Sequence, residues 1–204
     1  MRIENELLVD DPRFVDVTFR GTRTPDRLYP LEEPDTVVIH YDVCLTLDEN
    51  TNAVMASGYD YHLAAFGEMR DGERVVEMRQ YVPFNYRGAH AKGFNHRSIG
   101  IAFVNPGPLV EIPGQSGLWT VTKPQRLWTG GVVHAKQPGA GYEKWAAYDL
   151  ETVDMVGHVI GMLLRLKPSL KKIVRHSDVT PGKIDPGPAF PMERLKTMAF
   201  AYRG

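Results

Sequence analysis

The sequence predicts a single α/β domain, in which helices pack against a β-sheet. Two continuous apolar runs, at 36–42 and 98–104, are typical of buried strands. Between 149 and 166, apolar side chains recur every three or four positions, as on one face of a helix. The 204 residues are enough for one substantial core, and the chain contains no internal repeat.

The first half of the chain predicts a hairpin and a short helix around these strands. Residues 1–35 are polar and irregular, so we expect an N-terminal extension with one short strand at 14–19. The pattern of 46–55 favours a short helix. Asp71-Gly72 separates two strand-like runs and is a strong signal for a tight turn between them. The two runs are 61–66 and 73–78.

The second half of the chain predicts two helices. Asp149 can cap a helix that ends near Leu166, because Pro168 cannot continue it. A strand around Val174 follows, and residues 189–201 predict a closing helix. The apolar side chains of the first helix are Val153, Val156, Ile160 and Leu163, and those of the second are Phe190, Met192, Leu195 and Met198.

The composition limits the classes of partner and compartment. A formal net charge of -1 gives no reason to expect a nucleic acid or an anionic membrane surface as partner. Cys44 is the only cysteine, which excludes an intrachain disulfide and Cys-rich zinc ribbons. No apolar run approaches the roughly 20 residues of a membrane helix, and acidic residues stand where a signal peptide is apolar. We therefore expect a cytoplasmic chain that does not insert into membranes.

The segment 176–190 carries three reactive side chains, His176, Lys183 and Asp185, in a turn rich in Pro and Gly. Such turns lie on the surface and are stiff, because Pro restricts φ and Gly permits tight bends. The segment directly follows Ile173-Val174, an apolar pair that predicts a strand. We interpret it as a functional site. A polar loop that only connects two elements is the alternative.

His40 ends another predicted strand. A single histidine in a strand is more often a hydrogen-bonded core residue than a ligand. Together with His176 and Asp185, however, it could supply two imidazoles and one carboxylate from two strand ends of one sheet. Such a set suits catalytic zinc, which takes three protein ligands and leaves a position for water. Cys44, close behind His40, is expected to be a small buried residue.

Three motifs occur in an order that resembles a known enzyme family. They are Ile39-His40-Tyr41, the segment 88–100 with the sequence GAHAKGFNHRSIG, and His176 followed by Lys183-Ile-Asp185-Pro-Gly-Pro. Together they resemble the zinc-dependent N-acetylmuramoyl-L-alanine amidases, which include phage lysozyme-type amidases, muropeptide-recycling amidases and peptidoglycan recognition proteins. The likeness covers roughly residues 36–200 and implies a central mixed β-sheet flanked by helices.

Matched position by position, the resemblance implies roles for individual residues. His40, His176 and Asp185 correspond to the ligands of one zinc ion. At the third ligand position the recycling members carry Asp, as this chain does at Asp185. The phage lysozyme-type members carry Cys there. Lys183 corresponds to the lysine two residues before the third ligand, which stabilises the oxyanion of the reaction.

The resemblance also implies the groups around the zinc. Tyr61 matches the catalytic tyrosine, and the longer spacing to the hairpin turn leaves Tyr59 as a rival. The recycling members carry a catalytic Glu where this chain has Ala102, which favours a tyrosine-using, phage-like mechanism. His90 and Asn95 match the loop that lines the substrate groove. The alternative is that Asn95 shapes a turn and His90 caps it.

The activity that follows is zinc-dependent hydrolysis of the amide bond between N-acetylmuramic acid and L-alanine, in a phage-type endolysin. We expect a monomer that acts on peptidoglycan or muropeptides, with no nucleic-acid partner. A wall target would be reached with the help of another factor. Two other functions stay open: a non-catalytic peptidoglycan-binding module and a cytosolic recycling amidase.

Residues 105–142 have a different composition, with seven Gly, five Pro and two Trp. This favours a long insertion loop or a flexible hairpin, and loops of this length are uncommon unless they are functional. We expect the insertion, 105–148, near the substrate groove. Trp119 and Trp128 could stack on the substrate if they are exposed, and packing onto the core is the alternative.

Overall fold

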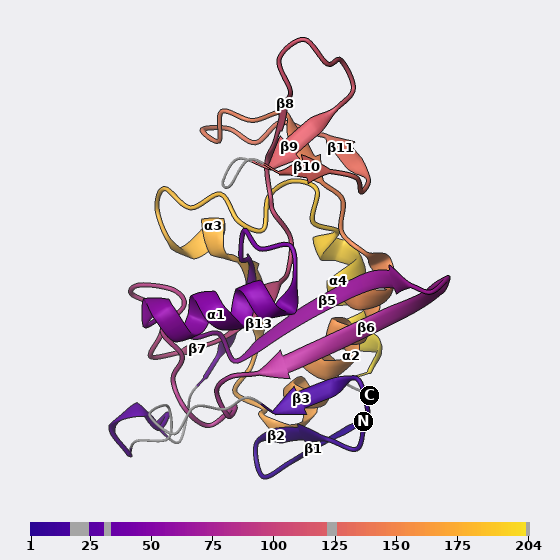
Figure 1. Ribbon diagram of the computed structural model, residues 1–204. Coiled ribbons are helices and arrows are strands. Elements are labelled where there is room, and N and C mark those ends of the chain that lie inside the picture. The colour runs from indigo at the N-terminus through magenta and orange to yellow at the C-terminus, as the bar shows by residue number, and fades with distance from the viewer. Residues whose placement is uncertain (17–24, 31–33, 122–125, 203–204) are drawn as a thin grey trace.

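A computed structural model of the chain describes residues 1–16, 25–30, 34–121 and 126–202. Its centre is a six-stranded mixed sheet with helices on both faces (Figure 1), which confirms the predicted fold class. Among the neighbouring strands of this sheet, only β5 (Leu63–Arg70) and β6 (Glu73–Gln80) run antiparallel. In spatial order the strands are β13 (Lys172–Arg175), β4 (Thr36–Tyr41), β7 (Ser98–Phe103), β5 (Leu63–Arg70), β6 (Glu73–Gln80) and β3 (Phe14–Asp16).

Strand β7 shows why the two faces of the sheet differ. Successive side chains of a strand point to opposite faces. Ile99, Ile101 and Phe103 therefore share one face, where they join the main core with the helices α2 (Leu150–Leu166) and α4 (Met192–Ala201). The other face of β7 carries small residues, Ser98, Gly100 and Ala102. These small residues leave room above the sheet for the side chains of the functional site.

The helices α2 (Leu150–Leu166) and α4 (Met192–Ala201) cover the first face. The Thr152 backbone N–H donates to Oδ2 of Asp149, 2.9 Å away, so the predicted cap is confirmed. All four predicted apolar residues of α2 are buried. In α4, Leu195 and Ala199 are buried, whereas the predicted Met198 is half-buried. No described helix has both the length and the apolar character that a membrane span requires.

The helix α1 (Leu47–Ser57) lies over the opposite face of the sheet. It begins at Thr46, whose Oγ1 accepts from the Glu49 backbone N–H at 3.2 Å. Leu47 and Val54 form an apolar cluster with Ala102 and other residues of this face. The predicted short helix is confirmed, and position 102 lies in an apolar setting.

The N-terminal extension is more ordered than the sequence predicts. It forms a hairpin of β1 (Arg2–Glu4) and β2 (Leu7–Val9), then β3, which pairs in parallel with β6. Leu8 is buried in the main core, and its backbone N–H donates to Oε1 of Gln80 at 2.9 Å. The end of the predicted 14–19 strand lies outside the described residues. A single 3-10 turn, η2, follows at Pro25–Arg27.

The insertion is neither one loop nor one hairpin, so that expectation was wrong. It contains a three-stranded antiparallel sheet and a separate hairpin, at the top of Figure 1. Leu109, Val121 and Ala146 form its small core, which is why the glycine-rich segment is ordered. The strands among its described residues are β8 (Leu109–Glu111), β9 (Trp119–Val121), β10 (Leu127–Trp128), β11 (Val132–His134) and β12 (Lys144–Ala146).

Candidate metal centre and active site

Two neighbouring parallel strands deliver the two predicted histidine ligands. His40 is the next-to-last residue of β4, and His176 directly follows β13 and opens the one-turn helix α3 (His176–Val179). Because β4 and β13 are parallel and adjacent, both histidines emerge at the same edge of the sheet. The centroids of the two imidazole rings are 4.4 Å apart.

The loop after α3 folds back and brings Asp185 to these rings. The Ser177 backbone N–H donates to the backbone carbonyl of Asp185 at 3.0 Å. Behind the loop, Gly187 has a φ of +78°, and a Cβ there would lie 2.7 Å from the Trp145 ring. The Tyr148 hydroxyl donates to the Pro186 carbonyl at 2.7 Å. The end of the insertion therefore supports the Asp185 loop from behind.

The three predicted ligands converge on one point. Nδ1 of His40 and Nδ1 of His176 each lie 3.0 Å from Oδ2 of Asp185, and all three side chains are buried. Their candidate ligand atoms lie within 4.8 Å of one another. Burial lowers the pKa of His40, against the opposing effect of the Asp185 carboxylate. Burial acts to raise the pKa of Asp185, but hydrogen bonds from His176 and His40 outweigh it and hold that pKa below the usual range.

The lowered pKa values of His40 and Asp185 are in the direction that a metal ion requires. A bound metal needs neutral imidazoles and an ionised carboxylate, because each ligand atom must offer a free lone pair. Two nitrogens and one carboxylate oxygen are donors that zinc accepts. The donor set and its spacing therefore fit a metal ion.

A cavity of about 350 Å³ opens next to these ligands. Tyr61 lines it, with its ring centroid 5.1 Å from that of His40. Tyr59, the predicted rival, also lines the cavity and is 54% exposed. Lys183 is exposed at the same cavity, and its ammonium makes no ion pair with the described residues. The structure thus brings both tyrosines and the lysine to one place.

His90 and Asn95 are placed differently from each other. His90 lines the cavity and contacts His40, with its Nδ1 3.0 Å from Nε2 of His40. Asn95 does not line this cavity. Its Oδ1 accepts from the backbone N–H groups of His90 and Ala91, at 3.0 and 2.7 Å. These contacts show that Asn95 shapes the loop, which was the alternative to a place in the substrate groove.

Comparison with known proteins decides the family. The sequence profile of the N-acetylmuramoyl-L-alanine amidases matches residues 30–188, which include every residue discussed above at this cavity. The chain belongs to this amidase family. It is an enzyme that hydrolyses the amide between N-acetylmuramic acid and L-alanine. No curated protein sequence matches the chain significantly.

Solved structures share the fold of this amidase. A selenomethionine derivative of AmpD aligns over 97% of this chain and 99% of its own, with a TM-score of 0.56 and 18% identity. AmiD from E. coli, solved with anhydro-N-acetylmuramic acid-L-Ala-D-γ-Glu-L-Lys, aligns over 86% of this chain and 60% of its own (TM-score 0.56, 20% identity). AmpDh3 from Pseudomonas aeruginosa, in complex with anhydromuramic pentapeptide, aligns over 94% and 66% (TM-score 0.55, 20% identity).

Asp42 and Val43 are among the residues of the amidase cavity that sequence reasoning missed. Asp42 lines it, and its Oδ1 accepts from the backbone N–H groups of Cys44 and Asn105. Burial raises the pKa of Asp42 to about 7. Val43, at the same cavity, has a φ of +66°, which is strained for a β-branched side chain. The position of Asp42, two residues after His40, was an available signal; no local pattern singles out Val43.

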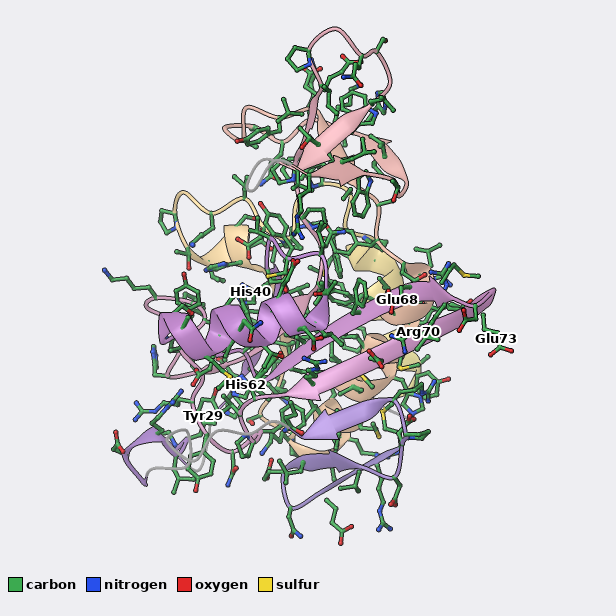
Figure 2. The ribbon with its side chains drawn as sticks, in the orientation of Figure 1. Tyr29, His40, His62, Glu68, Arg70 and Glu73 are labelled. Carbon is green, nitrogen blue, oxygen red and sulfur yellow. The ribbon has the colours of Figure 1, made fainter. Side chains whose placement is uncertain are left out.

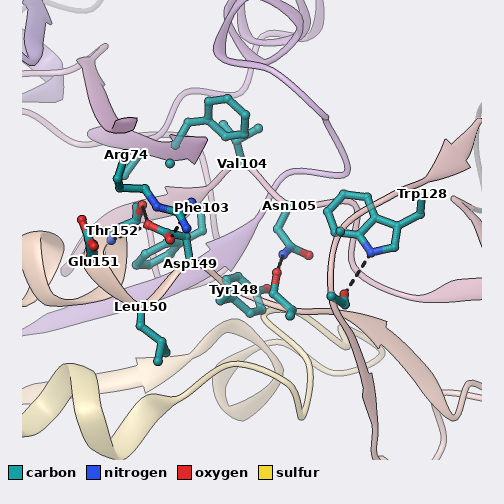
Figure 3. A pocket seen from close by; sticks show the side chains of 16 residues that line it. Arg74, Phe103, Val104, Asn105, Trp128, Tyr148, Asp149, Leu150, Glu151 and Thr152 are labelled. Atoms are coloured by element: carbon teal, nitrogen blue, oxygen red, sulfur yellow. Dashed lines mark hydrogen bonds and ion pairs between the residues drawn. The ribbon is translucent and has the colours of Figure 1, made fainter. Parts of the chain in front are cut away.

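A larger cavity of about 550 Å³ lies between the insertion, β5 and the start of α2 (Figure 3). Several of its polar side chains are paired with each other or with nearby backbone carbonyls. Arg74 pairs with Asp149 at 3.0 Å, and Nδ2 of Asn105 donates to the Ala147 carbonyl at 3.2 Å. The Trp128 indole N–H donates to the Gly131 carbonyl at 2.9 Å. Because this cavity contains none of the predicted site residues, we assign the chemistry to the smaller one.

The predicted tryptophan contacts with substrate find no support in the structure. Trp128 lines the larger cavity, and Trp119 packs beside Lys144, whose Nζ is 5.7 Å from the indole centroid. No described residue of 105–148 lines the amidase cavity. Both side chains pack against the small core of the insertion itself, whereas the alternative had placed them on the main core.

His62, labelled in Figure 2, lies beside His90, with the ring centroids 5.7 Å apart, but has a structural role. It is buried, its Nδ1 accepts from the Gly100 backbone N–H at 2.9 Å, and its Nε2 lies 2.8 Å from the Tyr86 carbonyl. Burial lowers the pKa of His62 to about 3, from an ordinary value of 6.5. At a pH between about 3 and 6.5, His62 binds a proton in the unfolded chain but not in the folded chain. The free energy of unfolding therefore rises with pH over this range.

We expect acidification from about pH 7 to about pH 5 to lower the free energy of unfolding by about 2 kcal/mol through His62 alone. Denaturant titrations of the metal-free protein at both pH values measure this. His62→Asn keeps an acceptor for the Gly100 N–H and does not titrate, so its stability should depend less on pH by that amount. An equally steep dependence in the variant would assign the effect to other groups.

Proposed function

We propose that this amidase is a zinc enzyme in which His40, His176 and Asp185 hold one ion. The observation that carries the proposal is the convergence of two buried imidazole nitrogens on one buried carboxylate at the wall of a cavity. The described residues offer no fourth ligand to this group, as in catalytic rather than structural zinc sites. When bound, zinc supplies Lewis acidity, which polarises a carbonyl and makes water more acidic.

Lys183 is proposed to stabilise the oxyanion. Water attack on the lactyl carbonyl carbon leaves negative charge on the carbonyl oxygen. The Lys183 ammonium stands at the cavity, two residues before Asp185, and its charge is among those that lower the pKa of His40. Since no described residue neutralises it, its charge is available to the developing oxyanion.

Tyr61 is proposed to carry a proton to the leaving group. Burial raises the pKa of Tyr61, so its hydroxyl is protonated at neutral pH. The hydroxyl would donate a proton to the L-alanine nitrogen as the amide bond breaks and regain one from the attacking water. No carboxylate is available at position 102, which lies in an apolar cluster beneath α1.

The biological role we propose is that of a phage-type endolysin, a monomer that stays in the cytoplasm until it is released to the wall. The resemblance of segment 88–100 to the phage members and the apolar Ala102 support this role. A muropeptide-recycling amidase is the second candidate, because Asp185 as third ligand is shared with the recycling members. In both roles the substrate is peptidoglycan or a fragment of it.

Digestion of purified sacculi tests the function. Mass spectrometry should find new free L-alanine amino termini and no new reducing sugar ends, and a chelator should suppress the products. Soluble anhydromuramoyl peptides, offered in parallel, separate the two roles. An endolysin cleaves whole sacculi efficiently, whereas a recycling enzyme would cleave only the soluble fragments. New reducing ends, or cleavage elsewhere in the stem peptide, would contradict the proposed activity.

A further inference from the structure

The His40 ring has polar neighbours at both of its nitrogens. Nδ1 lies 3.0 Å from Oδ2 of Asp185, and Nε2 lies 3.0 Å from Nδ1 of His90. A neutral imidazole carries one proton, and a metal binds only the nitrogen without it. For Nδ1 of His40 to bind a metal beside Asp185, the proton must therefore be on Nε2. That proton needs an acceptor.

The surroundings of His90 make its Nδ1 that acceptor. Nε2 of His90 lies 3.2 Å from the Ser98 carbonyl oxygen and 3.4 Å from the Ser98 hydroxyl oxygen. The carbonyl can only accept a hydrogen bond. The Ser98 hydroxyl donates its own proton to the Phe94 carbonyl at 2.7 Å, so it too faces His90 as an acceptor. Nε2 of a neutral His90 ring is consequently the protonated nitrogen, and its Nδ1 has a free lone pair.

The position of the His90 ring is itself built into the fold. Asn95 holds the loop at His90 and Ala91 through both backbone N–H groups. Beneath the ring, a Cβ at Gly100 would lie 2.4 Å from Cγ of His90, so this approach requires a glycine in β7. The His90 ring therefore lies between the loop that Asn95 fixes and Gly100 of β7, which has no side chain to clash with the ring.

We propose that His90 is a positioning residue that orients His40 and fixes its proton on Nε2, so that Nδ1 is free for the metal. Hydrogen bonds of this kind from a ligand's second nitrogen orient the ligand and raise its affinity. The two ligands differ in this respect, since Nε2 of His176 is buried and finds no partner among the described residues. The inference rests on the proposed zinc site.

A pair of variants of equal shape tests the hydrogen bond separately from the space that His90 fills. Asn and Leu have nearly the same size, but only Asn offers an acceptor oxygen near the position of Nδ1. We expect His90→Leu to weaken zinc binding by about 10–100-fold and His90→Asn to stay much closer to the unmodified protein. The zinc dissociation constant is measured by competition with a chromogenic chelator.

Thermal unfolding of the zinc-free variants checks that each is folded, and His90→Ala replaces His90→Leu if the latter does not fold. Equal zinc affinity of the Asn and the Leu or Ala variants would overturn the proposal, whether both bind weakly or both bind normally. His176→Ala tests the zinc site itself. If the unmodified protein binds zinc and His176→Ala does not, the proposed site stands whatever the His90 pair shows.

Discussion

Replacing His40 or His176 by alanine should remove bound zinc and turnover together. Each histidine would supply one of the three ligand atoms, which lie within 4.8 Å of one another. The two ligands that remain in either variant would hold zinc poorly. Loss of several kcal/mol of electrophilic stabilisation corresponds to at least about 10³-fold in rate. Zinc content by atomic emission and amide hydrolysis on sacculi measure the two effects. A variant that keeps full zinc occupancy and rate would show that its histidine is not a ligand.

Asp185 allows a control for the same prediction. Asp185→Cys should retain part of the zinc, because thiolate is also a good zinc ligand, whereas Asp185→Ala should not. The alanine variant also leaves the two buried imidazoles without their carboxylate partner. If Asp185→Ala keeps its zinc, the carboxylate has a role other than metal binding.

Lys183→Ala should lower turnover by about 10²–10³-fold and leave zinc content unchanged, as for other oxyanion donors. The reason is that Lys183 is exposed at the cavity, and its side chain makes no hydrogen bond or ion pair with the described residues that would hold the Asp185 loop. Lys183→Met, which keeps much of the chain length and removes the charge, is the matched control and should resemble Lys183→Ala. An unimpaired Lys183→Ala enzyme would leave the zinc site intact and refute the oxyanion role.

Tyr61→Phe should produce a comparable loss of turnover, because it removes only the hydroxyl from a ring packed beside His40. Tyr59→Phe is the matched control, since Tyr59 lines the same cavity and is more exposed. We expect Tyr59→Phe to stay within a few-fold of the unmodified enzyme. The reverse order of effects would assign the proton path to Tyr59, and loss of zinc in either variant would indicate a structural role.

Local patterns were sufficient for the elements that hold the metal ligands. The apolar run of β7, the Asp71-Gly72 turn and the Asp149 cap each depend on neighbours within a few residues, and the structure contains all three. His40 and His176 could be proposed as ligands because each stands at the end of such a strand. Short-range sequence therefore determined the fold class and the place of the candidate metal centre at the strand ends.

The tertiary structure decided what surrounds that centre, because those contacts join residues far apart in the chain. Trp145 packs against Gly187 behind the Asp185 loop, so part of the insertion belongs to the support of the site. No local pattern indicates that the amide of Asn95 turns inward or that Nδ1 of His90 meets Nε2 of His40, 50 positions away in sequence. The sequence alone determined which side chains could bind the metal. Their hydrogen-bond partners, and hence the nitrogen that each imidazole offers, depend on how loop, strand and insertion pack together.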